Sequence, residues 1–184
     1  MWGLSGCRST NSETVSIVPG PREAAPRTVA VIDSGAISSV VPADTTSFPV
    51  VAASNDLFEI LSGNQAQNRA QNPEVKSFAA QMISEHTKTA GELRSFGRDK
   101  NLSFPASPIP LHQRMLANLE RENAGHFDKK YMEMQVLAHE QAIAFFETAA
   151  QTETDPDLRA FAAKNIPALR KHLEMAKSTK AKVK

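Results

Sequence analysis

Three histidines and one glutamate are the side chains of this sequence best suited to chemistry. Glu59, His86, His139 and His172 each lie about twelve to seventeen residues inside a separate segment with helical patterning, roughly 18–25 Å of helical rise. If four such helices lie side by side, residues at equal height on their inner faces can meet. Imidazole and carboxylate groups are ligands for zinc, copper, nickel and iron. The spacing therefore predicts a transition-metal site formed by these four residues.

Three further polar residues are candidates to orient these ligands through hydrogen bonds. Glu85 directly precedes His86, while Asp128 and Tyr131 belong to the same segment as His139. A metal-binding histidine usually donates its second ring N–H to a carboxylate or a carbonyl. The same contacts fit another interpretation, in which the histidines are neutral core residues that are satisfied by a carbonyl, a hydroxyl or a carboxylate. Both interpretations stay open at the level of the sequence.

Other kinds of catalytic chemistry find little support in the residues. Carboxylate-bridged di-iron sites need Glu-x-x-His pairs, but Ile83, Val136 and Leu169 stand three residues before the three histidines. No Gly-x-Ser-x-Gly motif occurs, and the single cysteine, Cys7, lies close to the N-terminus. The sequence therefore favours a binding or structural module over an enzyme.

Two nearly identical segments mark the starts of two helices. NPEVKSFAAQMI begins at Asn72, and DPDLRAFAAKNI begins at Asp155. Each segment has a helix-capping residue, then proline at the first helical position, then an acid in the first turn. The repeat predicts two helical hairpins related by a pseudo-twofold axis.

Apolar patterning predicts four long helices, over about 46–70, 73–97, 126–153 and 156–180. The first is predicted to carry one stripe of Val51, Phe58, Leu61 and Gln65, and beside it a stripe of small residues, Ala52, Ser62, Ala66 and Ala70. Glu59 is either a ligand or a solvated edge residue.

Residues 98–125 are too many for a hairpin loop and include a short amphipathic stretch. The predicted fold is all-α, a ferritin-like four-helix bundle whose long crossover carries a short extra helix between the second and third long helices. His112 and His126 lie in the crossover and at a helix start, and both are expected at the surface.

The first 45 residues have a different character from the predicted bundle. Leu4-Ser5-Gly6-Cys7 resembles a bacterial lipobox, in which the cysteine is lipidated, so residues 1–7 are interpreted as the remnant of a lipoprotein signal. Only six residues precede Cys7, so the rest of such a signal is expected upstream of Met1. A chance cysteine is the alternative. Residues 8–45, rich in Ser, Thr, Val and Pro, are predicted to be a disordered, flexible linker, and residues 181–184 a Lys-rich tail.

Charge and hydropathy exclude several partners. Lys and Arg total 21 against 20 Asp and Glu, so no overall positive field is present to attract nucleic acid. No stretch of about 18 apolar residues occurs that would span a bilayer. Membrane attachment is therefore expected through lipidated Cys7.

The chain resembles the bacterial family called domain of unknown function 4142 over roughly residues 47–177. The residues that carry the resemblance are Ala52-Ala53, Glu59, Val75-Lys76-Ser77-Phe78-Ala79, Met82, Glu85-His86, Phe127-Asp128, Tyr131, Gln135, His139, Leu158, Phe161-Ala162, Pro167, Leu169, His172-Leu173 and Ala176. The chain departs from the usual family pattern at Asn55-Asp56, where glycines are common, and at Glu85 and Ala138, where an Asp precedes the histidine.

This resemblance implies a ferritin-like bundle in the cell envelope and no established activity. Many members of the family are described as outer-membrane proteins. Together with the lipobox it implies a periplasm-facing lipoprotein anchored to the outer membrane, with a protein partner or a second copy of the chain as candidate partners. The cofactor it would hold, if any, is a transition-metal ion.

Overall fold

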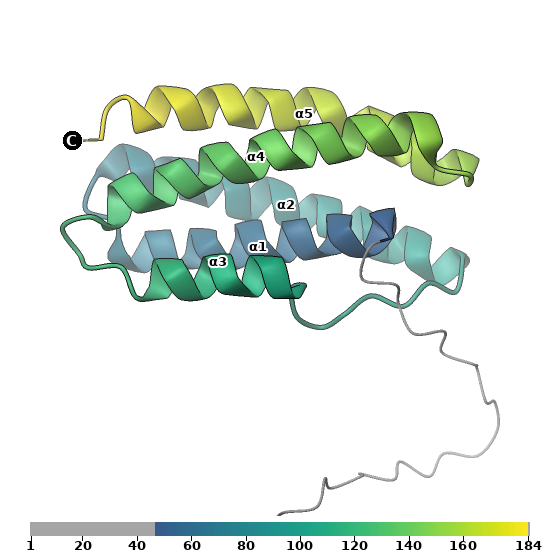
Figure 1. The fold of residues 1–184 in the computed structure, drawn as a ribbon, viewed down its shortest axis with the longest axis horizontal. Coiled ribbons are helices and arrows are strands. Elements are labelled where there is room, and N and C mark those ends of the chain that lie inside the picture. Colours follow the sequence, from purple (N-terminus) through teal and green to yellow (C-terminus); the bar gives the residue numbers. More distant parts are fainter. Residues whose placement is uncertain (1–46, 184) are drawn as a thin grey trace, which may run out of the picture. The chain divides into compact units, whose positions relative to one another are not determined.

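The computed structural model describes residues 47–183. These residues form five helices and no strands: α1 (Phe48–Arg69), α2 (Pro73–Asp99), α3 (Pro110–Glu120), α4 (Phe127–Thr152) and α5 (Pro156–Lys180) (Figure 1). The predicted all-α class is therefore confirmed. None of the described helices is long and apolar enough to cross a membrane. The predicted lipobox at Cys7 and the linker over residues 8–45 lie outside the described residues.

The four long helices form two hairpins. α1 packs along α2 and α4 packs along α5, while the shorter α3 lies beside α1 and also contacts α4 (Figure 1). Because the connection from α2 to α4 returns along the domain through α3, α2 and α4 run in the same direction.

Both second helices begin as the repeated sequence predicts. The side chain of Asn72 accepts a hydrogen bond from the N–H of Glu74 at 2.8 Å. Asp155 accepts from the N–H groups of Asp157 and Leu158 at 2.8 and 3.3 Å. Each capping residue is followed by a proline, whose missing N–H costs nothing at the first helical position.

The core consists of two apolar clusters with a polar layer between them. One cluster includes Phe78, Met82, Tyr131 and Ala176, and the other includes Phe48, Leu93, Phe146 and Leu169. In α2, His86 lies between Met82 of the first cluster and Leu93 of the second. His172 lies in the same way between Leu169 and Ala176 of α5. The packing of both clusters therefore holds the histidines at one level of the domain.

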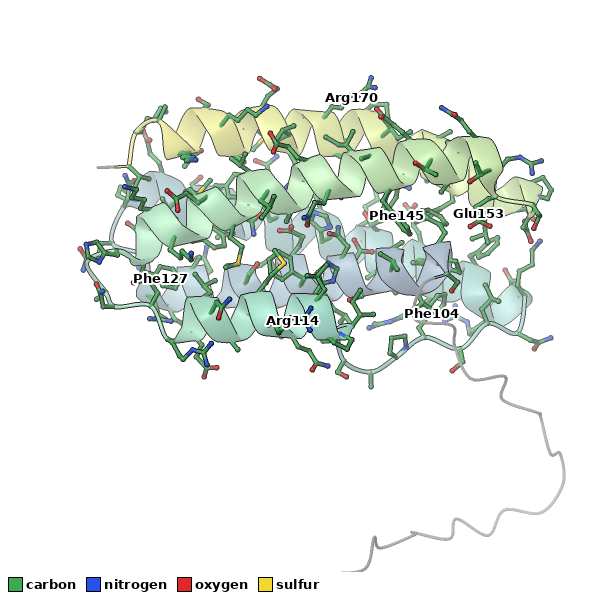
Figure 2. All side chains as sticks on the ribbon, viewed as in Figure 1. Phe104, Arg114, Phe127, Phe145, Glu153 and Arg170 are labelled. Atoms are coloured by element: carbon green, nitrogen blue, oxygen red, sulfur yellow. The ribbon has the colours of Figure 1, made fainter. Side chains whose placement is uncertain are left out.

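The outer faces of the helices carry charge. On the surface, Arg170 of α5 pairs with Glu147 of α4 at 2.6 Å, whereas Phe145 lies on the side of α4 that faces α1 (Figure 2). Lys182, in the predicted Lys-rich tail, approaches Glu74 of α2 at 3.3 Å, and Val183 packs against the first apolar cluster. Most of the described tail therefore contacts the helices.

The prediction for the inner face of α1 was partly wrong. The stripe of small residues, Ala52, Ser62, Ala66 and Ala70, is buried, but Leu61 of the other stripe is 41% exposed. Three polar residues outside both stripes, Ser54, Asn55 and Asp56, are buried as well, and so is Glu59. The interpretation of Glu59 as a solvated edge residue is wrong, because its side chain is almost fully enclosed.

The expectation that His112 lies at the surface is also wrong. His112 is buried in α3, and its Nδ1 forms a 2.7 Å hydrogen bond with Oγ of Ser54. His126, at the N-cap of α4, is exposed as expected.

Candidate metal centre

Three of the four predicted ligands meet in the polar layer. His86 of α2, His139 of α4 and His172 of α5 each offer one ring nitrogen, and these three atoms lie within 4.8 Å of one another. The ring centroids are 5.4 to 5.9 Å apart, so the three imidazoles form a nearly equilateral triangle. All three side chains are at most 3% exposed. The fold thus encloses three imidazoles at one point.

Each imidazole is held by one hydrogen bond. Nδ1 of His139 donates to the backbone carbonyl of Gln135 at 2.8 Å. Nε2 of His172 donates to Oε2 of Glu85 at 2.6 Å, and Nδ1 of His86 lies 2.8 Å from Oδ1 of Asp56. The carbonyl at His139 and the carboxylate at His172 place the ring proton on the bonded nitrogen, so the other nitrogen of each ring presents a lone pair, and an ionised Asp56 does the same for His86.

The second nitrogen of each ring is buried without a partner. Nε2 of His86, Nε2 of His139 and Nδ1 of His172 have no hydrogen-bond partner in the described part of the chain. A buried polar atom that lacks a partner costs roughly 1–3 kcal/mol. Three such atoms on neighbouring rings are a donor set that a metal ion satisfies directly.

Burial keeps these imidazoles uncharged. It lowers the pKa of His86 to about 4 and that of His139 to about 3, and the neighbouring histidines lower the pKa of His139 further. Burial also lowers the pKa of His172. Neutral imidazole is the form that binds metal ions, so the rings are ready to bind at neutral pH.

Glu59, the fourth predicted ligand, does not join the group of converging atoms. Its Oε1 lies 3.8 Å from Nδ1 of His139, the nitrogen that is already bonded to the carbonyl of Gln135. Burial raises the pKa of Glu59 to about 8, so this carboxyl group is protonated at neutral pH and the contact is not an ion pair. Glu59 is a neighbour of the centre and not one of its three converging ligands.

The three residues predicted to orient the histidines have different places. Glu85 holds His172, and although partial burial raises its pKa, hydrogen bonds from Gln81 and His172 lower it, with a net downward shift. Tyr131 is fully buried two turns before His139, but its hydroxyl makes no hydrogen bond within the described residues.

Asp128 lies away from the centre. It is three turns before His139 on α4, roughly 16 Å along the helix. Its carboxylate accepts hydrogen bonds from the backbone N–H groups of Gln71 and Asn72, at the turn between α1 and α2. Asp128 therefore ties the second hairpin to the first and does not orient a histidine.

Sequence reasoning missed two partners of the centre. Asp56 holds His86, and the carbonyl of Gln135 holds His139. A signal for Asp56 was present, because it stands three residues before Glu59 and so shares its helix face. The carbonyl of Gln135 could not be predicted, because every residue has a backbone carbonyl and residue type does not indicate which one binds a histidine.

The fold and the centre together define an all-helical domain with a buried set of three imidazoles. The chain belongs to the family described as domain of unknown function DUF4142, whose family model matches residues 34–179. A comparison with curated proteins finds no match.

One solved structure has a similar fold. The crystal structure of a DUF305 fragment from Deinococcus radiodurans matches with a TM-score of 0.59 and 14% sequence identity, covering 74% of this chain and 97% of that chain. At this identity the likeness concerns the arrangement of the helices alone.

Proposed function

We propose that this domain binds one transition-metal ion through Nε2 of His86, Nε2 of His139 and Nδ1 of His172. Two observations carry the proposal: one ring nitrogen from each of the three buried histidines lies within 4.8 Å of the others, and each ring has one nitrogen without a hydrogen-bond partner among the described residues. Nitrogens that bind one zinc ion tetrahedrally lie roughly 3.4 Å apart, given Zn–N bonds of about 2.0–2.1 Å. Metal binding would therefore draw the three ring nitrogens closer together than the 4.8 Å limit within which they lie.

The donor set selects a class of ion. Imidazole nitrogen suits Zn²⁺, Cu²⁺, Ni²⁺ and iron, whereas Mg²⁺ and Ca²⁺ prefer oxygen. Among divalent ions, affinity for such a site rises toward Cu²⁺ and falls again at Zn²⁺. Three protein ligands leave a fourth position for water or a small anion.

The surroundings of the ligands also suit a metal. Carboxylates behind His86 and His172 fix the orientation of each ring and increase the basicity of its free nitrogen. Asp56 is buried, and burial raises its pKa well above the ordinary value. The charge of a metal ion in the centre would stabilise the ionised form of Asp56, so binding should release protons.

The competing function is a binding or structural module of the cell envelope whose histidines serve only the core. It is favoured by the hydrogen bond that each ring already makes. This alternative predicts that the protein contains no metal and that loss of a histidine affects stability alone. In neither case do we assign an enzymatic activity.

We further propose that α1, α2, α4 and α5 form a ferritin-like four-helix bundle. The parallel course of α2 and α4 and the long connection through α3 support this arrangement. The cell envelope is the proposed location, with the protein facing the periplasm and anchored to the outer membrane through Cys7. The support is the Leu4–Cys7 motif and the family resemblance, and the test is incorporation of labelled palmitate by the full gene product but not by Cys7→Ala.

Metal content decides between the two functions. Protein purified without chelator is analysed for metal by elemental mass spectrometry. Protein from which a chelator has removed all metal is then titrated with Zn²⁺ and with Co²⁺, and the visible spectrum of Co²⁺ reports its coordination number. We expect one ion per chain, and we expect His139→Ala to lose it while His126→Ala, at an exposed histidine, retains it. The loss should exceed the roughly 10–100-fold change typical of an outer hydrogen-bond partner.

Two results would contradict metal binding. One is wild-type protein that takes up neither ion although it is folded. The other is His139→Ala protein that unfolds more easily but binds as much metal as the wild type.

A further inference from the structure

A cavity of about 190 Å³ lies between α1, α3 and α4, apart from the three histidines of the metal centre. Residues of α1 and α4 that line it are sequence neighbours of the centre, Asn55 beside Asp56 and Ala138 beside His139. The cavity includes none of the proposed metal ligands. It is therefore a separate site, close to the level of the polar layer.

The walls of the cavity differ in chemistry. Phe145 and Phe146 contribute aromatic surface from α4, whereas Asn55 of α1 and His112 of α3 contribute polar side chains that are each only 7% exposed. No side chain of Asp, Glu, Lys or Arg lines it among the described residues. Because burying an unpaired charge is very costly, this composition selects an uncharged ligand.

The polar wall is held in place before any ligand arrives. Oγ of Ser54 accepts a hydrogen bond from the N–H of Ile109 at 2.8 Å and also bonds to Nδ1 of His112 at 2.7 Å. The imidazole of His112 lies against Phe58 with the ring centroids 5.4 Å apart. With Nδ1 engaged, Nε2 is the polar atom that this ring has left for a ligand.

The aromatic wall is equally well fixed. Phe48 packs against Phe145 and Phe146 with ring centroids 5.7 and 5.0 Å apart. Side chains already held by such contacts lose less entropy when a ligand binds. Leu111, which also lines the cavity, is 44% exposed and marks the side where the cavity meets solvent.

We propose that this cavity binds a small, neutral ring compound that carries one hydroxyl group, with the ring against Phe145 and Phe146 and the hydroxyl toward His112 and Asn55. The volume fits one ring, since an engineered protein cavity of about 150 Å³ binds benzene. This site does not depend on the proposed metal site, because the two share no ligand-binding residue.

Phenol and toluene are the probes, because they have the same number of heavy atoms and differ in the hydroxyl group. The full chain is titrated with each and followed through backbone amide shifts and through nuclear Overhauser contacts from probe protons to Ile109 and Phe145. We expect saturable phenol binding, with toluene roughly threefold to tenfold weaker for want of one hydrogen bond. His112→Leu should remove this preference.

A matched pair of variants on α4 tests the location. Ala142 lines the cavity, whereas Ala144 is exposed on the same helix. Ala142→Leu should weaken phenol binding by about tenfold or more by filling the space, and Ala144→Leu should bind phenol as the wild type does. Zn²⁺ affinity should be the same in both variants, which separates this test from that of the metal site.

Three outcomes would overturn the proposal: no saturable shift in the wild type, no contacts from phenol to Ile109 or Phe145, or equal binding of phenol by wild type and Ala142→Leu. If Ala142→Leu does not fold, the Overhauser contacts in the wild type decide. Toluene that binds as tightly as phenol would refute the role of the hydroxyl group.

Discussion

The two hairpins begin their second helices with nearly the same sequence, yet they contribute different chemistry to the centre. The α4–α5 hairpin supplies two imidazoles, His139 and His172. The α1–α2 hairpin supplies one imidazole and the carboxylates that hold His86 and His172. In the described structure, no acidic side chain of α4 or α5 forms a hydrogen bond with any of the three histidines.

This difference shows how a repeated unit can be specialised. The caps and prolines that start α2 and α5 are the same in kind because both hairpins need the same helix geometry. The central layer has no such constraint, so the carboxylates that hold the rings come from one hairpin and two of the three imidazoles come from the other. His86 finds its partner Asp56 within the first hairpin and His139 the carbonyl of Gln135 within the second, whereas the bond from His172 to Glu85 joins the two hairpins. The centre therefore belongs to the interface between the hairpins.

Removing the carboxylates of the first hairpin gives the largest expected change. Asp56→Asn should lower Zn²⁺ affinity by about 10–100-fold, since a neutral amide holds His86 less firmly than a carboxylate does. Glu85→Gln should lower it less, because the side chain of Glu85 is 39% exposed and water can replace it. Competition with a coloured chelator measures both affinities.

The control for this pair is Glu92→Gln, at a surface residue of α2 that pairs with Lys164. Its Zn²⁺ affinity should equal that of the wild type. A larger loss for Glu85→Gln than for Asp56→Asn would show that burial does not rank these partners. Three equal affinities would mean that the carboxylates of Asp56 and Glu85 do not support metal binding.

The next effect is on the pH dependence of stability in metal-free protein. Burial raises the pKa of Glu59 from 4.5 to about 8, so between these values the folded protein holds a proton that the unfolded chain lacks. Stability from this group is therefore complete below pH 4.5 and falls as the pH rises toward 8. Burial lowers the pKa of His86 from 6.5 to about 4, so the contribution of this group to folding stability is lost as the pH falls through that range.

Glu59→Gln tests the alkaline side of this profile. The amide resembles the protonated carboxyl but cannot ionise, so it should remove a decline of at most about 1.4 kcal/mol per pH unit between pH 4.5 and 8. Thermal unfolding in chelator from pH 4 to 9 should show that the variant gains stability relative to wild type as the pH rises. The exposed Glu174→Gln serves as control. A difference between Glu59→Gln and wild type that stays constant with pH would show that Glu59 does not titrate as inferred.

The helix starts and the central histidines could be predicted from the sequence because their signals are local or periodic. A cap, a proline and an acid lie next to one another at Asn72 and at Asp155, so three neighbouring residues define each start. Apolar residues on both sides of His86 and His172 place these rings inside the domain. No knowledge of distant partners is needed for either inference.

The inner face of α1 and the burial of His112 could not be predicted in this way. Patterning treats polar residues as outward-facing, but α1 is packed against α2, α3 and α4, so Ser54 and Asp56 are enclosed with polar partners on other helices. His112 can be buried because α3 packs beside α1, where the hydroxyl of Ser54, 58 residues away in the sequence, forms a hydrogen bond with its ring. Partners at such separations are defined only by the folded structure.

The smallest expected effect tests whether the repeated helix starts are equivalent. Asn72→Ala and Asp155→Ala each remove a side-chain cap and should lower the Tm by about 3 °C. Asp155 also pairs with Lys100 at 2.8 Å, so its variant should show the larger loss at low salt, and the two losses should become similar at high salt, which screens the exposed pair. Thermal unfolding at two salt concentrations measures this, and Lys100→Ala gives the combined effect of the Lys100 pairs with Asp155 and, at 2.9 Å, with Asp157. If Asn72→Ala leaves the Tm unchanged, the hydrogen bonds from Gln71 and Asn72 to Asp128 suffice to hold the first turn, and the two starts are alike in sequence but not in energy.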